Sequence, residues 1–179
     1  METTERIVEA YCRYVKEWFT LPNIRCAGQH EVDLLAVDLH GADEPERYHI
    51  ECGVSISGAF SKLTAKPFSA DRLHHRVHAP EQRRTIDFFI EHKFAPLAIL
   101  ETLRRHGFEP DRYTRVIVSW GWTKEAGERA LKESIVLWDF RSILREIGEA
   151  FRHTRSYFTD DTLRTLQLFA KASAEVAER

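Results

Sequence analysis

Two short strand-like runs joined by a turn constrain the fold of this chain most. The runs are HEVDLLAVDL at residues 30–39 and YHIECGVSIS at residues 48–57. The segment HGADEPER at 40–47 separates them and carries the Gly, Asp and Pro residues of a turn. Strands joined by so short a connection pair antiparallel, because a parallel pair needs a longer crossover. We therefore predict a hairpin over residues 30–57.

The second run alternates between apolar and polar side chains. Successive residues of a strand point to opposite faces of the sheet. The residues predicted to face the core are Ile50, Cys52, Val54 and Ile56. The residues predicted to face an uncrowded polar side are His49, Glu51, Gly53, Ser55 and Ser57.

The rest of the chain predicts helices around further strands. An amphipathic helix over residues 4–19 comes first, followed by a short strand or strand-like approach at 24–28. The later helices are predicted at 81–92, 95–106, 123–132, 142–150 and about 160–177, and the later strands at 113–120 and 135–140. An antiparallel meander followed by strand–helix–strand predicts an α/β fold, with a mixed sheet flanked by helices and an additional C-terminal helix.

Composition sets limits on the class of protein. The chain has 179 residues, of which 43% are hydrophobic and 30% charged, as in one folded globular domain. A formal charge of -2 gives no overall attraction to nucleic acid, so any such surface is a local patch. Three cysteines without CxxC spacing favour a reducing cytoplasm, and we expect neither a secretory signal nor a membrane span. Phosphate-loop, α/β-hydrolase and zincin motifs are missing from the sequence.

Each strand of the predicted hairpin contains a carboxylate. Asp33 lies in the first run and Glu51 in the second. Two acids on adjacent strands can bind a divalent cation such as Mg²⁺ or Mn²⁺, and a cation bound in this way can promote phosphodiester hydrolysis. Gly53 follows two residues after Glu51, where a site of this kind usually has a lysine.

The order of these elements resembles the PD-(D/E)XK nuclease superfamily, which has the restriction-endonuclease-like fold. The matching residues are Glu9 on the first helix, Asp33 in EVDLLAV and Glu51 in HIECGVS. The segment YTRVIVSWGWTKEAGERALKESIVLWDF is similar to the closing strand–helix–strand of that family. The resemblance implies a nuclease-like domain over residues 1–150, with residues 151–179 as a helical extension packed on the same domain.

The resemblance also implies roles for individual residues. Asp33, Glu51 and the carbonyl oxygen of Cys52 would bind the metal, and Glu9 would belong to the active site. The family's lysine stabilises developing charge and orients the attacking water. Gly53 cannot do this, which leaves two alternatives. Either a lysine reaches the site from elsewhere, with Lys62 and Lys66 as first candidates and Lys93 behind them, or catalysis is lost.

A basic segment follows the hairpin. Residues 61–93 contain seven Lys or Arg residues against four acids, which makes this segment the best candidate for contacting phosphates. The basic residues are Lys62, Lys66, Arg72, Arg76, Arg83, Arg84 and Lys93.

The function implied is a Mg²⁺-dependent endonuclease that acts on DNA more than on RNA. Without a separate recognition domain it would cut with little sequence preference or depend on a partner subunit or a homodimer. The family resemblance implies a role in prokaryotic defence or DNA repair. The alternative is a nuclease-like domain without catalysis that serves as a nucleic-acid-binding or subunit-assembly module.

Overall fold

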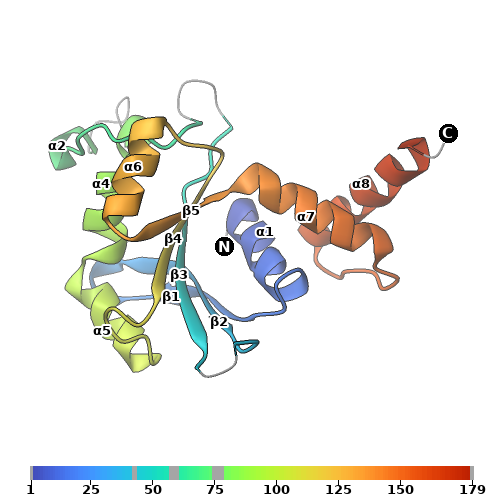
Figure 1. The fold of residues 1–179 in the computed structure, drawn as a ribbon, viewed down its shortest axis with the longest axis horizontal. Coiled ribbons are helices and arrows are strands. Elements are labelled where there is room, and N and C mark those ends of the chain that lie inside the picture. The colour runs from blue at the N-terminus through green and yellow to red at the C-terminus, as the bar shows by residue number, and fades with distance from the viewer. Residues whose placement is uncertain (1, 42–43, 57–60, 74–78, 178–179) are drawn as a thin grey trace.

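A five-stranded mixed sheet forms the centre of the molecule in a computed structural model of the chain (Figure 1). The structure describes residues 2–41, 44–56, 61–73 and 79–177. The strands lie in chain order; β1, β2 and β3 pair antiparallel, and β3, β4 and β5 pair parallel. Their bounds are β1 Phe19–Arg25, β2 Glu31–Asp38, β3 Glu46–Cys52, β4 Thr114–Ser119 and β5 Ile135–Asp139. The predicted mixed α/β sheet, with a meander and a parallel crossover, is confirmed.

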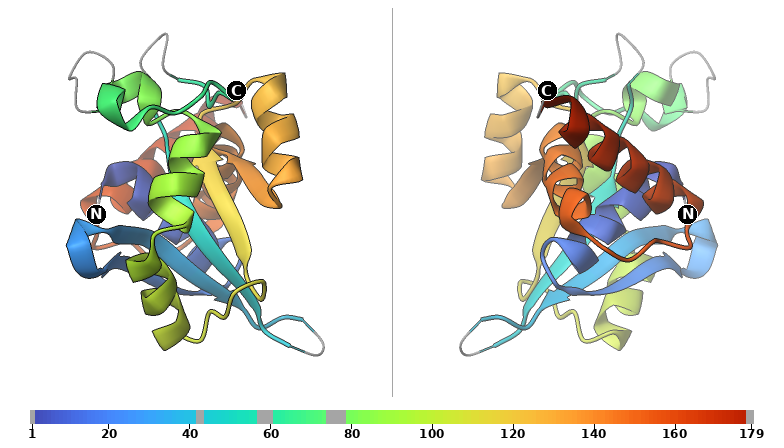
Figure 2. Two further views of the ribbon diagram at one scale, coloured as in Figure 1. Left: turned by 90° about the vertical axis from the view of Figure 1, so that its left-hand side faces the viewer. Right: turned by 90° about the vertical axis from the view of Figure 1, so that its right-hand side faces the viewer.

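Helices cover both faces of this sheet (Figure 2). One layer consists of α1 Thr3–Tyr14, α7 Phe140–His153 and α8 Asp161–Ala177. The opposite layer consists of α4 Ile86–Phe88, the π-helix η3 Phe89–Phe94, α5 Leu97–Arg105 and α6 Lys124–Lys132. The short helices are η1 Ala27–Gln29, α2 Ala70–Leu73 and α3 Ala79–Gln82. Within the described ranges, no helix combines the length and the apolar character that crossing a membrane requires.

The main core lies between the sheet and the layer of α1 and α7. Ile143, Ile147 and Phe151 recur every four residues along α7, so they form one apolar stripe that packs on the sheet beside Val118. Leu163 of α8 is buried in the same cluster. The C-terminal helix therefore contributes to the core that holds α1 and α7 in place.

The opposite face of β3 is buried as well, which corrects one expectation. His49 and Glu51 have no exposed surface, although the alternation predicted an uncrowded polar side. The reason is that η3 and α5 lie over this face, and the ring of Phe94 packs edge-on against His49 with centroids 4.9 Å apart. Polar side chains on this strand therefore sit inside the protein.

Boundaries predicted near β1 and β3 are also wrong. Helix α1 ends at Tyr14 instead of continuing to Phe19, and the first strand runs over Phe19–Arg25 instead of 24–28. Between them Glu17 adopts a left-handed conformation with φ of 58°, which turns the chain back toward the sheet. Strand β3 ends at Cys52, and Ile56 is 76% exposed instead of facing the core, because the chain leaves the sheet there. Ser57, the last residue of the predicted run, lies outside the described residues.

Candidate functional site

Asp33 and Glu51 lie where the pairing between β2 and β3 ends. The last pair of this register is Leu34 with Ile50, and beyond it side-chain oxygens replace the backbone acceptors. The N–H of Cys52 donates to Oδ2 of Asp33 at 2.8 Å, and the N–H of Asp33 donates to Oε1 of Glu51 at 3.4 Å. The two carboxylates therefore converge at the open end of the hairpin.

A local distortion of β1 and β2 positions Asp33. Val32 packs in the cluster under α5, whereas Leu34 packs in the cluster under α1. Strict alternation would place both residues on one face, so the face changes at Asp33. Asn23 occupies the matching position of β1 and has a φ of 51°, a left-handed conformation that Asn tolerates better than most residues. The backbone thus departs from a regular strand at the residue that carries the carboxylate.

Glu51 is held from the inside of the protein by His49. Nε2 of His49 lies 2.8 Å from Oε1 of Glu51, and both side chains are fully buried. Burial lowers the pKa of His49 to about 3, so its ring is neutral, and with Glu51 ionised Nε2–H is the donor. The sequence analysis gave His49 no role. Its only signal there was a polar side chain two residues before Glu51, on the same face of the strand.

A lysine reaches both carboxylates from the helical layer above them. Nζ of Lys93 lies 2.9 Å from Oδ1 of Asp33 and 2.6 Å from Oε2 of Glu51. Lys93 belongs to η3, a six-residue π-helix of the kind that often occurs at functional sites. The predicted single helical piece over 81–92 is instead α3, α4 and η3, with Thr85 capping α4 by accepting from the N–H of Phe88. Lys93, the third-ranked candidate, is the lysine that contacts the acids.

The same π-helix explains why position 53 is a glycine. A Cβ atom built on Gly53 would lie 2.5 Å from Cζ of Phe89, far inside van der Waals contact. The ring of Phe89 is buried and fills the space that any side chain at position 53 would need. Phe89 and Lys93 are four residues apart on η3, so one element both excludes a lysine at position 53 and supplies an ammonium group.

Burial dominates the electrostatics of this cluster. It raises the pKa of Asp33 to about 7, and the neighbouring charge of Glu51 adds to this effect. Burial also raises the pKa of Glu51 to about 7, although Lys93 acts in the opposite direction. Burial alone would lower the pKa of Lys93, but the charges of Glu51 and Asp33 outweigh it and raise the pKa. Two ionised carboxylates would face one ammonium group, so the cluster retains a negative charge that a cation could balance.

The oxygen atoms that face Lys93 could hold a divalent cation. Oδ1 of Asp33 and Oε2 of Glu51 already converge on one positively charged group, and small shifts of these hard oxygen ligands would reach Mg²⁺ distances. Within the described part of the chain, no group of three or more His, Cys, Asp or Glu residues is arranged to hold a metal. A cation at this point would therefore take its other ligands from water, backbone carbonyl groups or a bound phosphate, as Mg²⁺ commonly does.

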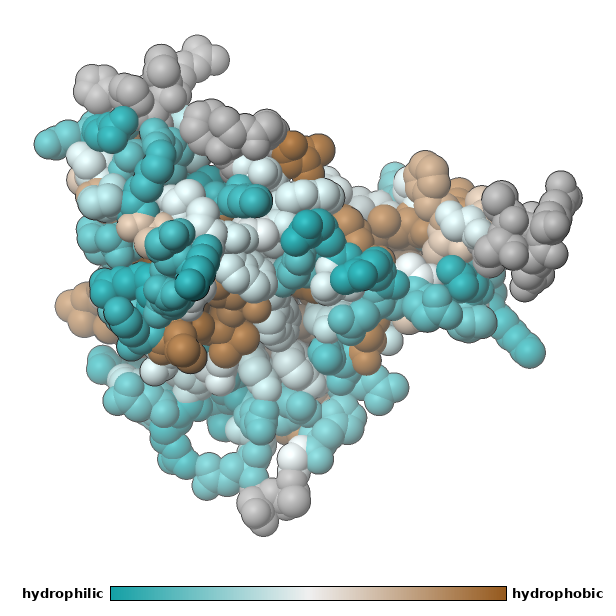
Figure 3. All heavy atoms as spheres, turned by 45° about the horizontal axis from the view of Figure 1, so that its top comes forward, coloured by the Kyte–Doolittle hydropathy of each residue, from teal (hydrophilic) through white to brown (hydrophobic). Residues whose placement is uncertain are grey.

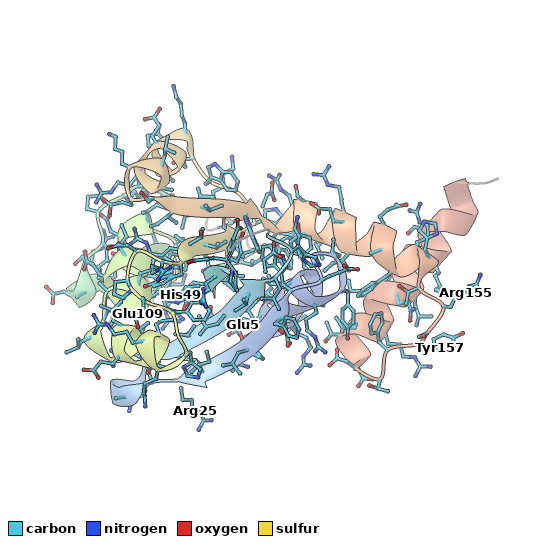
Figure 4. The ribbon with its side chains drawn as sticks, turned by 60° about the horizontal axis from the view of Figure 1, so that its bottom comes forward. Glu5, Arg25, His49, Glu109, Arg155 and Tyr157 are labelled. Carbon is cyan, nitrogen blue, oxygen red and sulfur yellow. The ribbon has the colours of Figure 1, made fainter. Side chains whose placement is uncertain are left out.

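The glutamate predicted from helix α1 is not part of this cluster. Glu9 accepts a hydrogen bond from Thr20 at 3.3 Å and lies 3.7 Å from Arg13. Glu5, one helical turn earlier, interacts electrostatically with Asp33; burial raises the pKa of Glu5, and the charge of Asp33 contributes. Figure 4 labels Glu5 and His49, which both lie near the middle of the molecule in that view. On helix α1 the structure thus relates Glu5 to Asp33, whereas Glu9 contacts Thr20 and Arg13.

The basic segment is only partly available for phosphate. The first two candidate lysines lie outside the cluster: Lys62 is exposed, and Lys66 forms an ion pair with Glu81 at 2.6 Å. Arg72 lies 3.7 Å from the same carboxylate, and Arg83 is exposed. Figure 3, which brings the top of Figure 1 forward, shows hydrophilic residues interspersed with hydrophobic ones on that face.

Arg84 and Arg76 complete the predicted basic set. Arg84 is half-buried and donates to the carbonyl oxygen of Val54 at 3.1 Å, just beyond the end of β3. Burial lowers the pKa of Arg84, with the nearby Arg83 contributing. Arg76 lies outside the described residues. Of this set, Lys93 is the residue that the structure brings into contact with Asp33 and Glu51.

Comparisons with known proteins give little further information. No protein-family model matches the chain, and no curated protein matches it either. The chain is similar to a crystal structure described as that of a protein of unknown function, AF1548, with 16% sequence identity and a TM-score of 0.42. That similarity covers 98% of this chain and 94% of the other. At this identity and TM-score it transfers no function.

Proposed function

We propose that the protein is a metal-dependent DNA endonuclease of the PD-(D/E)XK superfamily, in which Lys93 replaces the lysine missing at position 53. The observation that carries this proposal is the contact of one ammonium group with both Asp33 and Glu51. Two carboxylates and a lysine are the groups that the family's motif brings together. Here the lysine comes from the helical layer instead of from β3.

Each residue has a defined task in this proposal. Asp33 and Glu51 hold a Mg²⁺ or Mn²⁺ ion, which when bound polarises the phosphoryl oxygen and lowers the pKa of the attacking water. Lys93 releases its contact with the carboxylates and donates to a phosphate oxygen as negative charge develops there. His49 and the N–H of Cys52 fix one oxygen of each carboxylate, so the other oxygen faces the cation.

Exposed basic residues in the segment after β3 support a nucleic-acid substrate. Lys62 and Arg83 are exposed in the segment that follows β3, and phosphate contacts of such residues need no base sequence. This fits an enzyme that cuts DNA with little sequence preference, or one that a partner subunit or second copy directs to its target.

A cleavage assay with matched variants tests the proposal. Purified protein is incubated with plasmid, single-stranded DNA and RNA, with Mg²⁺, Mn²⁺ or EDTA. We expect cleavage of DNA with metal, and its loss in Asp33→Asn, Glu51→Gln and Lys93→Met. Lys132→Met is the matched control, because it removes an exposed lysine of α6 that has no part in the cluster or in the basic segment.

Two results would count against this assignment. Cleavage that survives both carboxylate substitutions would place the chemistry elsewhere in the protein. Binding of DNA without cleavage under every metal would favour the second candidate, a nucleic-acid-binding or assembly module in which Lys93 serves as a permanent counter-ion of the buried acids.

A further inference from the structure

A second concave site opens on the other face of the sheet, between α1, α7 and the end of β5. Its cavity volume is about 510 Å³, within the range of small-molecule sites. Figure 1 shows α1 and α7 side by side where β5 ends. The residues of this site that matter here are Tyr11, Lys16, Trp18, Tyr48, Trp138 and Glu146, and we refer to them as the aromatic pocket.

Four aromatic rings give the aromatic pocket flat walls. Trp18 stacks on Tyr48 with centroids 4.3 Å apart and an interplanar angle of 12°. Trp138 lies next to this stack, 5.9 Å from Trp18, and meets Tyr11 edge-on at 5.8 Å. Trp18, Tyr48 and Trp138 are only partly buried, so ring surface remains accessible within the cavity. Such surfaces favour a planar ligand that can stack.

The polar groups of the aromatic pocket include both a donor and an acceptor. Nζ of Lys16 lies 5.4 Å from the ring centroid of Tyr11. Glu146 is exposed and accepts a hydrogen bond from the hydroxyl of Tyr11 at 2.9 Å, which orients its carboxylate. An organic cation is disfavoured because the ammonium group of Lys16 already occupies the ring of Tyr11, and an anion is disfavoured by Glu146. The remaining fit is a neutral planar ligand whose edge carries both acceptors and donors.

The aromatic pocket lies near the edge of the sheet where β3 ends beside Asp33 and Glu51. Trp138 pairs with Val118, and Val118 pairs with Cys52, the residue after Glu51. Two strand spacings separate β3 from β5, which amounts to about 10 Å. The acids and the aromatic pocket lie on different faces, but an unpaired strand that crosses this edge could reach both.

We propose that the aromatic pocket binds an unpaired nucleobase by stacking, with Glu146 accepting from the base's amino group and Lys16 donating to a ring nitrogen or carbonyl. This inference rests on the proposed function, because it specifies the substrate as DNA with a single-stranded portion. A base meets each requirement of the site: it is flat and neutral, and its edge carries donors and acceptors.

A fluorescence titration tests this site without any need for cleavage. The probe is the nucleoside of 2-aminopurine, which is neutral, whose fluorescence is quenched on stacking and whose edge carries an amino donor and a ring-nitrogen acceptor. The titration is performed in EDTA, and is repeated with a single-stranded oligonucleotide that contains one 2-aminopurine. We expect saturable quenching that weakens at least about fivefold in Trp138→Leu, the loss typical of one base–aromatic stack.

Glu146→Gln tests the same site with less risk to folding, because a glutamine can still accept from Tyr11. Its matched control is Glu149→Gln, an exposed glutamate of the same helix that does not line the aromatic pocket. We expect weaker binding of the probe in Glu146→Gln and no change in Glu149→Gln. Absence of saturable quenching, or equal quenching in all three variants, would overturn the proposal. DNA cleavage without probe binding would reject the aromatic pocket alone, whereas probe binding without cleavage would reject the nuclease alone.

Discussion

Replacing Lys93 by methionine removes the only positive charge that the described structure brings into contact with both Asp33 and Glu51. Breaking a buried ion pair by deleting one partner costs about 3–5 kcal/mol, because the other charge stays buried and uncompensated. The Lys93 side chain is 24% exposed, so we expect a loss near the lower end, about 3 kcal/mol. That loss corresponds to roughly a hundredfold shift of the folding equilibrium.

The loss should depend on pH in a defined direction. The pKa values of Asp33 and Glu51 are raised to about 7, so both groups are largely protonated at pH 5 and largely ionised at pH 8. An ammonium group stabilises only ionised carboxylates, so Lys93→Met should cost much less at pH 5 than at pH 8. Urea unfolding in EDTA at both pH values measures the difference, with Lys62→Met as the control. An equal loss at both pH values would refute the ion-pair reasoning.

The remaining predictions concern the same cluster. In EDTA the wild-type protein should lose stability as pH rises from about 5 to above 7, because the folded pKa values of Asp33 and Glu51 lie above their unfolded values. Added Mn²⁺ should restore stability at pH 8. The midpoints of urea unfolding measure both effects. Gly53→Ala should cost about 1–3 kcal/mol of unfolding free energy through its clash with Phe89, whereas Gly148→Ala, whose Cβ meets no atom within 4 Å, should be neutral or stabilising. His49→Leu should cost about 1–3 kcal/mol of unfolding free energy, because Oε1 of Glu51 loses its buried donor. The same variant should bind Mn²⁺ more weakly in calorimetry, and unchanged metal affinity would exclude a positioning role for His49.

Local patterns in the sequence were sufficient to predict four of the five strands, β2 to β5, but not the position of β1. The hairpin followed from two strand-like runs and a turn, and the parallel crossover followed from strand–helix–strand at 113–140. Asp33 and Glu51 could be paired because a hairpin register brings two such residues together over a short sequence separation. These features depend on residues that are close along the chain or on the next strand. The periodicity of apolar residues predicts such local relations well.

The other members of the cluster depend on contacts that periodicity cannot describe. Alternation placed His49 and Glu51 on a common face, but it could not show that η3 and α5 cover that face. The family resemblance implied an acid from the first helix and pointed to Glu9, but Glu5 is the residue that interacts with Asp33, because the rotation of α1 on the sheet decides which side chain faces β2. Lys93 lies 60 residues from Asp33 along the chain. It belongs to a π-helix, and the sequence gave no signal for this kind of helix.

Gly53 and Lys93 are coupled through Phe89. A glycine at position 53 could leave space beside the carboxylates. Instead Phe89 fills that space, and its contact with position 53 allows no Cβ atom without a shift. The ring also fixes η3 against the end of β3, which brings Lys93 within 2.9 Å of Asp33. The glycine is therefore a requirement for this approach of the helix, and the approach brings the ammonium group of Lys93 to the two carboxylates.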